Sequence, residues 1–160
     1  MTEFVTTVDI ERPLETVWNY LTDLDRAKDW SSDVVETVYL GPIRLGATGA
    51  DIRRIGKNEI KVDWEVVGYH PPTLLVLTFG PPVNSIARFS LRPTPTGGTR
   101  LTSRTTIKPN GWMRIISPLI VAEARRADER QLARAKSNLE SRQMHRSRAT
   151  PTNLIAGRSR

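Results

Sequence analysis

Residues 34–107 carry six runs with strand-type patterning, and no segment between them could form a helix. Parallel strands need a long crossover connection, usually a helix, whereas antiparallel strands are joined by short turns. Turn-forming segments such as Gly56-Lys57-Asn58 and Thr96-Gly97-Gly98 separate the runs. This stretch therefore predicts a sheet that is antiparallel throughout. The expected strands are Val34–Leu40, Ala50–Ile55, Glu59–Gly68, Leu74–Phe79, Ser85–Leu91 and Arg100–Ile107.

The residues before this stretch predict one more strand and two short helices. Residues 4–10 alternate between apolar and polar side chains, as a half-buried strand does. Pro13 is suited to the first position of a helix, and an apolar stripe of period 3.6 follows it through Leu21. Thr22-Asp23 can cap a second short helix that runs to about Trp30.

The pattern becomes helical again after Asn110-Gly111. Ser117-Pro118 has the form of a helix cap followed by a first-turn proline, so we expect the main helix to start there. Continuing to about Met144, it would have about 27 residues and a length of ~40 Å. Its apolar stripe is thin and rich in small residues, which leaves space beside the helix. The stripe consists of Ile120, Val121, Ala124, Ala127, Leu132, Ala135 and Leu139.

Together these elements predict an α+β helix-grip fold. A curved antiparallel sheet of about seven strands would wrap around the long C-terminal helix, with two short helices after the first strand. A sheet with one apolar face needs a cover, and only the long helix can supply it. Side chains cannot fill a strongly bent sheet that grips a single helix, so we expect an internal cavity.

The element order and several local motifs resemble the START-like superfamily, of the polyketide cyclase/dehydrase and lipid-transport type. Residues 13–23 resemble the family's opening helix, with its Val-Trp pair and closing Asp, and Trp30 resembles the tryptophan that ends the second short helix. Residues 98–102 resemble the last hairpin and strand, and residues 118–120 the entry into the long helix. The resemblance covers about residues 3–140. It implies lipid, quinone or hormone binding, polyketide cyclisation, or the modification of other proteins.

Length and charge suit one START-like ligand-binding domain over residues 1–145 and a basic, disordered tail over residues 146–160. The chain has 160 residues and a net charge of +7, but five arginines and no acid lie after Ser141. Residues 1–140 therefore hold 19 basic and 17 acidic side chains. Because the excess charge belongs to the tail and not to a folded face, we expect no nucleic-acid partner.

Several other classes of function lack the residues they require. The absence of cysteine excludes disulfides, thiolate catalysis and Cys-ligated metal centres, and two distant histidines, His70 and His145, are too few for catalytic zinc. No phosphate-binding glycine motif is present, so we expect no cofactor and no metal. The most apolar window, residues 115–122, is too short for stable membrane insertion. The first residues lack the apolar run of a secretory signal, so we expect a cytoplasmic monomer or homodimer.

Strand alternation predicts which side chains face the cavity. In the expected strand Glu59–Gly68, Val62, Trp64 and Val66 share the apolar face, while Asp63 and Glu65 lie on the other face. The same argument places Phe89, Ser103 and Thr105 inside and the arginines of the last two strands outside. The pocket is thus predicted to be apolar with a few hydroxyls. Carboxylates are expected on the outer face of the sheet.

The helix and two aromatic residues complete the candidate ligand-binding set. Ile120, Ala124 and Ala127 lie on one helix face, with Glu123 beside them, and Trp112 precedes the helix at the cavity mouth. Glu123 has two interpretations: a polar anchor or general base in the cavity, or an acid in the first turns of the helix that forms surface ion pairs. We favour the second. Tyr39 is a candidate whose direction stays open, because the alternation in residues 34–55 is mixed, and Asp51 shares that ambiguity.

Three functions fit these features. The first is the binding, and with it transport or sequestration, of a hydrophobic small molecule such as a lipid in the internal cavity. The second is a metal-free aromatase/cyclase or dehydratase that acts on a polyketide-like substrate in the same cavity, and it requires an inward carboxylate or tyrosine with a proton-transfer partner. The third is a module that binds a protein through the outer face of the sheet, and it requires a small, filled cavity. The apolar inward set favours the first.

Overall fold

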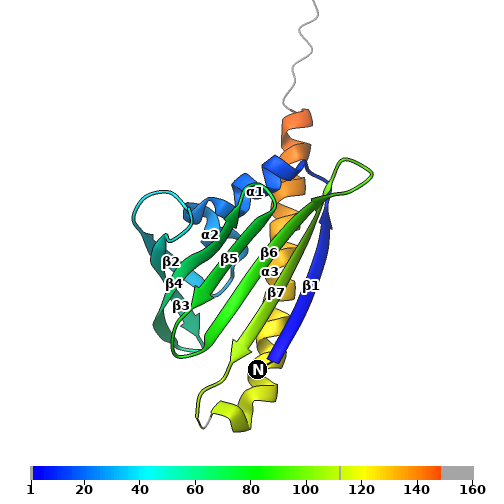
Figure 1. The fold of residues 1–160 in the computed structure, drawn as a ribbon. Coiled ribbons are helices and arrows are strands. Elements are labelled where there is room, and N and C mark those ends of the chain that lie inside the picture. Colours follow the sequence, from blue (N-terminus) through cyan, green and yellow to red (C-terminus); the bar gives the residue numbers. More distant parts are fainter. Residues whose placement is uncertain (1, 112, 149–160) are drawn as a thin grey trace, which may run out of the picture.

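Seven strands form one curved sheet, and a single long helix crosses its concave side (Figure 1). The computed structural model describes residues 2–111 and 113–148. Its strands and helices, in chain order, are β1 (Thr2–Ile10), α1 (Leu14–Thr22), the short 3₁₀ turn η1 (Leu24–Arg26), α2 (Ala27–Trp30), β2 (Val34–Tyr39), β3 (Thr48–Ile55), β4 (Asn58–His70), β5 (Leu74–Phe79), β6 (Asn84–Pro93), β7 (Thr99–Lys108) and α3 (Met113–Arg148).

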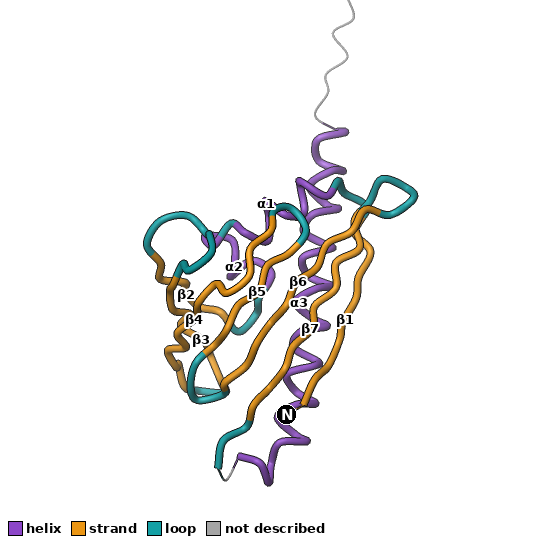
Figure 2. The backbone as a smooth tube through the Cα atoms, viewed as in Figure 1, coloured by secondary structure: helices purple, strands orange, loops and turns teal. Residues whose placement is uncertain are grey.

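The sheet is antiparallel at every strand pair, as the short turns predict. Its strand order is β1-β7-β6-β5-β4-β3-β2, so β1, the first strand in the chain, pairs with the last one, β7. Figure 2 shows how the strands bend as a group, with the short helices at one end and α3 behind β6, β7 and β1. This confirms the helix-grip fold predicted from the order of patterns.

The long helix begins earlier than the sequence predicts. α3 starts at Met113, and Pro118 lies inside it, so the prediction that Ser117-Pro118 caps the helix is wrong. A proline removes one backbone hydrogen bond, but its fixed φ is helical, so a preceding turn can join the helix. The helix ends at Arg148 and not at about Met144. Residues 149–160 of the predicted tail lie outside the described residues.

The hydrophobic core occupies one end of the sheet. Leu132, Ala135 and Leu139 from the C-terminal half of α3 are buried against α1 and the strands. Ile10 and Leu101, at paired ends of β1 and β7, are almost completely buried in the same cluster. Among the side chains that the structure describes, the N-terminal half of α3 contributes none to this cluster. The helix is therefore fixed to the sheet over part of its length only.

Polar contacts hold the same half of α3 to the turn after β1. The backbone N–H of Glu11 donates to Oε1 of Glu140 at 3.0 Å, and Arg12 donates to the carbonyl of Leu139 at 2.9 Å. Lys136 donates to the carbonyl of Asp9 at 2.6 Å and to Glu140 at 2.7 Å. The Lys136 ammonium and the Glu11 N–H lower the pKa of Glu140, because both favour its charged form.

Among residues 2–111 and 113–148, no helix is both long enough and apolar enough to cross a membrane. α3 has the necessary length, but charged residues recur along it.

Leu132→Ala and Leu139→Ala should each lower the free energy of unfolding by about 2–5 kcal/mol, because each removes a buried side chain and leaves a cavity. Leu119→Ala is the matched control. It makes the same substitution in the same helix at a leucine that is 75% exposed, and it should change stability by less than about 0.5 kcal/mol. Urea unfolding measures all three. Core variants as stable as the control would contradict the packing of α3 on the sheet.

Candidate functional site

A cavity of about 860 Å³ lies between the inner face of the sheet, α2 and the N-terminal half of α3. Its position follows from the core, which fills the opposite end of the sheet and leaves this end unpacked. Apolar side chains make up most of the wall. They include Phe4, Leu21, Trp30, Ile60, Val62, Trp64, Leu75, Leu77, Phe79, Ala87, Phe89, Ile107, Leu119, Ile120, Ala124 and Ala127.

Strand alternation correctly assigned the inner face of β4, β6 and β7. Val62, Trp64 and Val66 are buried, while Asp63 and Glu65 between them are exposed. Eight of the predicted ligand-binding residues lie in the cavity wall, and whether they bind a ligand stays a prediction. They are Val62, Trp64, Phe89, Thr105, Ile120, Glu123, Ala124 and Ala127.

Three predicted site residues lie elsewhere. Val66 is fully buried in the hydrophobic core, away from the cavity wall, and Ser103 is fully buried beneath α3. Tyr39 lies outside the cavity, where its hydroxyl donates to Asp25 at 2.9 Å. The hydrogen bond to Asp25 raises the pKa of the Tyr39 hydroxyl, and burial adds a smaller effect in the same direction. Trp112 lies outside the described residues.

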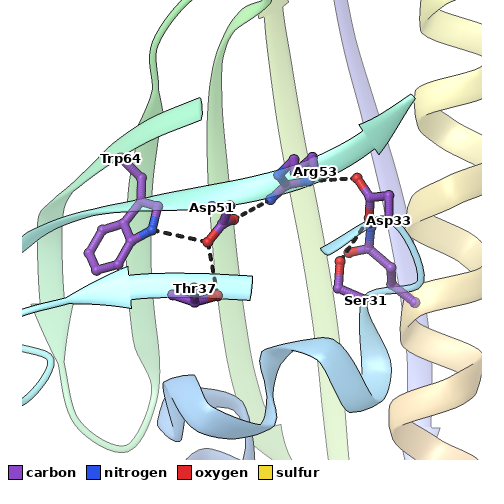
Figure 3. Close-up of polar contacts among 7 residues, drawn as sticks. Ser31, Asp33, Thr37, Asp51, Arg53 and Trp64 are labelled. Carbon is purple, nitrogen blue, oxygen red and sulfur yellow. Dashed lines mark hydrogen bonds and ion pairs between the residues drawn. The ribbon is translucent and has the colours of Figure 1, made fainter. Parts of the chain in front are cut away.

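The cavity wall is mostly apolar, as the sequence predicts, but it also contains charged residues that strand alternation did not place there. Asp51 and Arg53 of β3 pair with Val62 and Ile60 of β4, and this register turns both side chains inward. Their guanidinium and carboxylate meet at 2.8 Å, and Asp33 binds the same guanidinium at 2.9 Å (Figure 3). Charges can be buried when they are paired and hydrogen-bonded. The i, i+2 spacing of opposite charges in one strand is a sequence signal for such a pair.

The Asp51 carboxylate orients the Trp64 indole in the cavity wall. Its Oδ1 accepts hydrogen bonds from Trp64 Nε1 at 3.2 Å and from the Thr37 hydroxyl at 3.1 Å, while its Oδ2 is held by Arg53. Gly49 allows the indole to lie close to β3, because a Cβ there would overlap the ring. With both oxygens engaged, Asp51 fixes the wall and has no free oxygen for a ligand.

A second set of contacts connects this ion pair to the helices. Asp33 follows α2, and its Oδ1 accepts a hydrogen bond from Ser31 at 2.9 Å and one from Gln131 of α3 at 3.4 Å. The guanidinium of Arg53 also lies over the Phe79 ring, 5.2 Å from its centroid. The sheet, α2 and α3 are thus linked across the cavity wall.

Glu123 lies at the rim of the cavity, where it forms a surface ion pair. Its side chain is 64% exposed, and Oε1 accepts a hydrogen bond from Arg130 at 2.9 Å. These contacts agree with the surface ion pairing favoured from the sequence and give no support to a buried anchor or base.

The buried carboxyl on α3 is Asp128, one turn further along the helix. It lies in the cavity wall with only 7% of the residue exposed, and the Ser103 hydroxyl of β7 donates to its Oδ1 at 3.0 Å. Burial raises the pKa of Asp128, and the charge of Glu129 acts in the same direction. The hydroxyls of Thr6 and Ser103 oppose the shift because they favour the charged form. The sequence did carry a signal for this acid, because Asp128 lies four residues after Ala124 and four before Leu132, on the apolar stripe of the helix.

Within the described parts of the chain, no three His, Asp or Glu side chains are grouped as a metal site would require. The arrangement can hold an apolar molecule against aromatic and aliphatic side chains and offer it a few hydrogen bonds.

A family model described as polyketide cyclase/dehydrase and lipid transport matches residues 1–140. The match confirms the resemblance found in residues 3–140. No curated protein matches the sequence.

Solved structures share the fold at low sequence identity. The protein TTHA0849 from Thermus thermophilus has a TM-score of 0.72 and 12% identity, over 88% of this chain and 98% of that one. A conserved protein from Geobacillus kaustophilus has a TM-score of 0.70 and 17% identity, over 88% and 96%. DynU16, a putative protein in the dynemicin biosynthetic locus, has a TM-score of 0.65 and 19% identity, over 86% of this chain and 47% of that one. At these identities the likeness concerns the fold alone.

Asp128→Asn should stabilise the protein increasingly as pH rises. The folded pKa of Asp128 lies above its unfolded value, so the folded state binds the proton more tightly. Stability therefore falls as pH rises through the interval between the two pKa values, because ionisation costs more in the folded state. Asparagine fits the same site and has no such cost.

Thermal unfolding from about pH 4 to about pH 8 measures this effect. Glu15→Gln is the control, because it makes the same change of charge at an exposed residue of α1 that does not act on Asp128. A difference in melting temperature between Asp128→Asn and the wild type that stays constant with pH would contradict the raised pKa of Asp128.

Proposed function

The chain belongs to the polyketide cyclase/dehydrase and lipid transport family, and we propose that it binds a hydrophobic small molecule in the cavity between the sheet and α3. Binding of this kind serves transport or sequestration. The observation that supports it is the cavity itself, whose volume of about 860 Å³ lies in the range of small-molecule sites, roughly 300–1,000 Å³.

The hydrogen bonds that hold the cavity wall in place indicate a binding cavity and not a region of loose packing. Trp64 and Arg53 are held in place by Asp51, and Asp33 connects the same network to α3 through Gln131. A wall fixed in this way does not collapse into the space beside it. An apolar ligand would gain contacts with side chains that otherwise face unfilled volume.

The size of the cavity also bears on the alternative functions. A protein-binding module would need a small, filled cavity, and a cavity of about 860 Å³ does not meet that condition.

A polyketide-type aromatase/cyclase or dehydratase remains the second candidate, because the cavity wall contains an inward carboxyl with a hydroxyl partner, Asp128 with Ser103. The family description covers that activity as well. Conversion of a poly-β-keto thioester, followed by mass spectrometry for loss of water, distinguishes an enzyme from a binding protein.

The purified protein should bind one equivalent of the neutral apolar dye N-phenyl-1-naphthylamine, with a rise in its fluorescence. Burial of ~300 Å² of apolar dye surface gains roughly 7 kcal/mol before the cost of association is subtracted, so the dissociation constant is micromolar at best. Native mass spectrometry should also show a co-purified molecule that leaves on denaturation.

Ala124→Trp should abolish dye binding, because the indole would fill the cavity from α3. Ala122→Trp places the same side chain on the exposed face of the same helix and should bind dye as the wild type does. Circular dichroism checks that both variants are folded. Equal binding by the two variants, or no binding by the folded wild type, would rule out the cavity as the binding site.

A further inference from the structure

Four arginines lie opposite one another on the outer face of the sheet. In the register of β6 and β7, Arg88 pairs with Arg104 and Arg92 pairs with Arg100. All four side chains are exposed, because their neighbours in each strand turn toward the cavity or the core. The two arginine pairs lie about 13 Å apart along the strands. Figure 1 shows this face of β6 and β7, with α3 behind the sheet.

The fold compensates the charge of the β7 arginines only. Arg100 forms an ion pair with Asp9, and Arg104 forms one with Glu3, both on β1. Within the described ranges 2–111 and 113–148, the two arginines of β6 form neither an ion pair nor a side-chain hydrogen bond. Like charges directly opposite each other destabilise a sheet. Since the fold gains nothing from the β6 arginines, their position points to a partner outside the chain.

The sequence around these strands contains no acid. Between Glu65 and Glu123 lie 57 residues with six lysines and arginines and no aspartate or glutamate. β5, β6 and β7 all fall within this stretch. The near balance of charge over residues 1–140 therefore hides an uneven distribution. A folded face carries an excess of positive charge, in addition to the arginines that follow Ser141.

Apolar side chains flank the arginines on the same face. Val5 of β1 is opposite Arg104, and Val76 of β5 is opposite Arg88, so one row across the sheet reads Val-Arg-Arg-Val. Val5 is 41% exposed. Protein interfaces combine apolar side chains with arginine and are depleted in lysine. The phosphates of a nucleic-acid backbone would offer the valines no apolar contact.

The same face lacks the stacking side chains of a single-stranded nucleic-acid site. β5, β6 and β7 contain two aromatic residues, Phe79 and Phe89, and both line the cavity on the other side of the sheet. Proteins that bind single strands stack the bases on aromatic side chains. The chemistry of the outer face therefore favours an acidic protein over a nucleic acid.

We propose that the outer face of β6 and β7 binds a second protein, through a surface that combines carboxylates with apolar side chains. The carboxylates would bind Arg88 and Arg92, for which the described chain supplies no counter-charge, and the apolar side chains would cover Val5 and Val76. A guanidinium suits this role because it can bind a carboxylate through two parallel hydrogen bonds. The face lies on the opposite side of the sheet from the cavity. Binding of the partner is therefore independent of ligand binding.

Two fluorescein-labelled acidic polypeptides of equal length test the proposal by fluorescence anisotropy at physiological salt: poly-L-glutamate and a random copolymer of glutamate and tyrosine. The wild type should bind the copolymer more tightly than polyglutamate, because only the copolymer offers apolar contacts. Arg88→Glu/Arg92→Glu should weaken copolymer binding at least about tenfold, because two attractive contacts become repulsive. Val5→Ser should reduce the preference for the copolymer.

Arg44→Glu/Arg126→Glu is the matched control. It makes the same change of net charge at two exposed arginines away from this face, one in the loop before β3 and one on α3, and should weaken copolymer binding less than about twofold. Equal losses in the two double variants would overturn the inference, because net charge and not this face would then set the affinity. Tighter binding of oligouridylate than of the copolymer, lost in Arg88→Glu/Arg92→Glu, would overturn it in favour of a nucleic acid.

A purely structural role of the β6 arginines predicts a loss of stability when they are replaced. Arg88→Thr/Arg92→Thr removes both charges and introduces a residue that favours strands, so its melting temperature should equal or exceed that of the wild type. A lower melting temperature would show that these arginines stabilise the sheet, and it would overturn the inference.

Discussion

The attachment of α3 at one end only is the constraint on which the rest of the structure depends. Leu132 and Leu139 bury the C-terminal half of the helix in the core, and Arg12, Lys136 and Glu140 hold it to the turn after β1. In the N-terminal half, described side chains such as Ile120, Ala124 and Ala127 are only partly buried and line the cavity instead of packing against the sheet. A packed core at one end and a cavity at the other are two results of the same helix position.

Most charged side chains of the cavity wall are paired with opposite charges of the protein itself. Asp33, Asp51 and Arg53 compensate one another, and their remaining hydrogen bonds go to Ser31, Thr37, Trp64 and Gln131, as Figure 3 shows for all of these except Gln131. Such a network orders the wall without offering it to a ligand. Asp128 differs, because it is buried with a hydroxyl partner, Ser103, in place of a cation.

Family membership and fold similarity constrain the function less than these contacts do. The family model covers both cyclase/dehydrase and lipid-transport proteins, and the three solved structures described above are only 12–19% identical to this chain. One fold can host unrelated activities, so the choice between them depends on the side chains in the cavity. In this chain those side chains are mostly apolar, with paired arginines and a buried acid.

The sequence by itself determined the seven-stranded antiparallel sheet, the long covering helix and the inward faces of β4, β6 and β7, because alternation with a period of two fixes each face locally. It could not place Tyr39, Asp51 or Arg53, since β2 has an irregular register and the polarity of β3 is mixed. It named Glu123 as a candidate and overlooked Asp128, although Asp128 lies four residues from both Ala124 and Leu132 on the apolar stripe of the helix. Their positions were decided by contacts between distant segments: Asp33 with Arg53, Gln131 with Asp33, and Ser103 with Asp128. Only the tertiary structure brings these partners together, because the burial of a charge depends on what lies across from it and not on its neighbours in the chain.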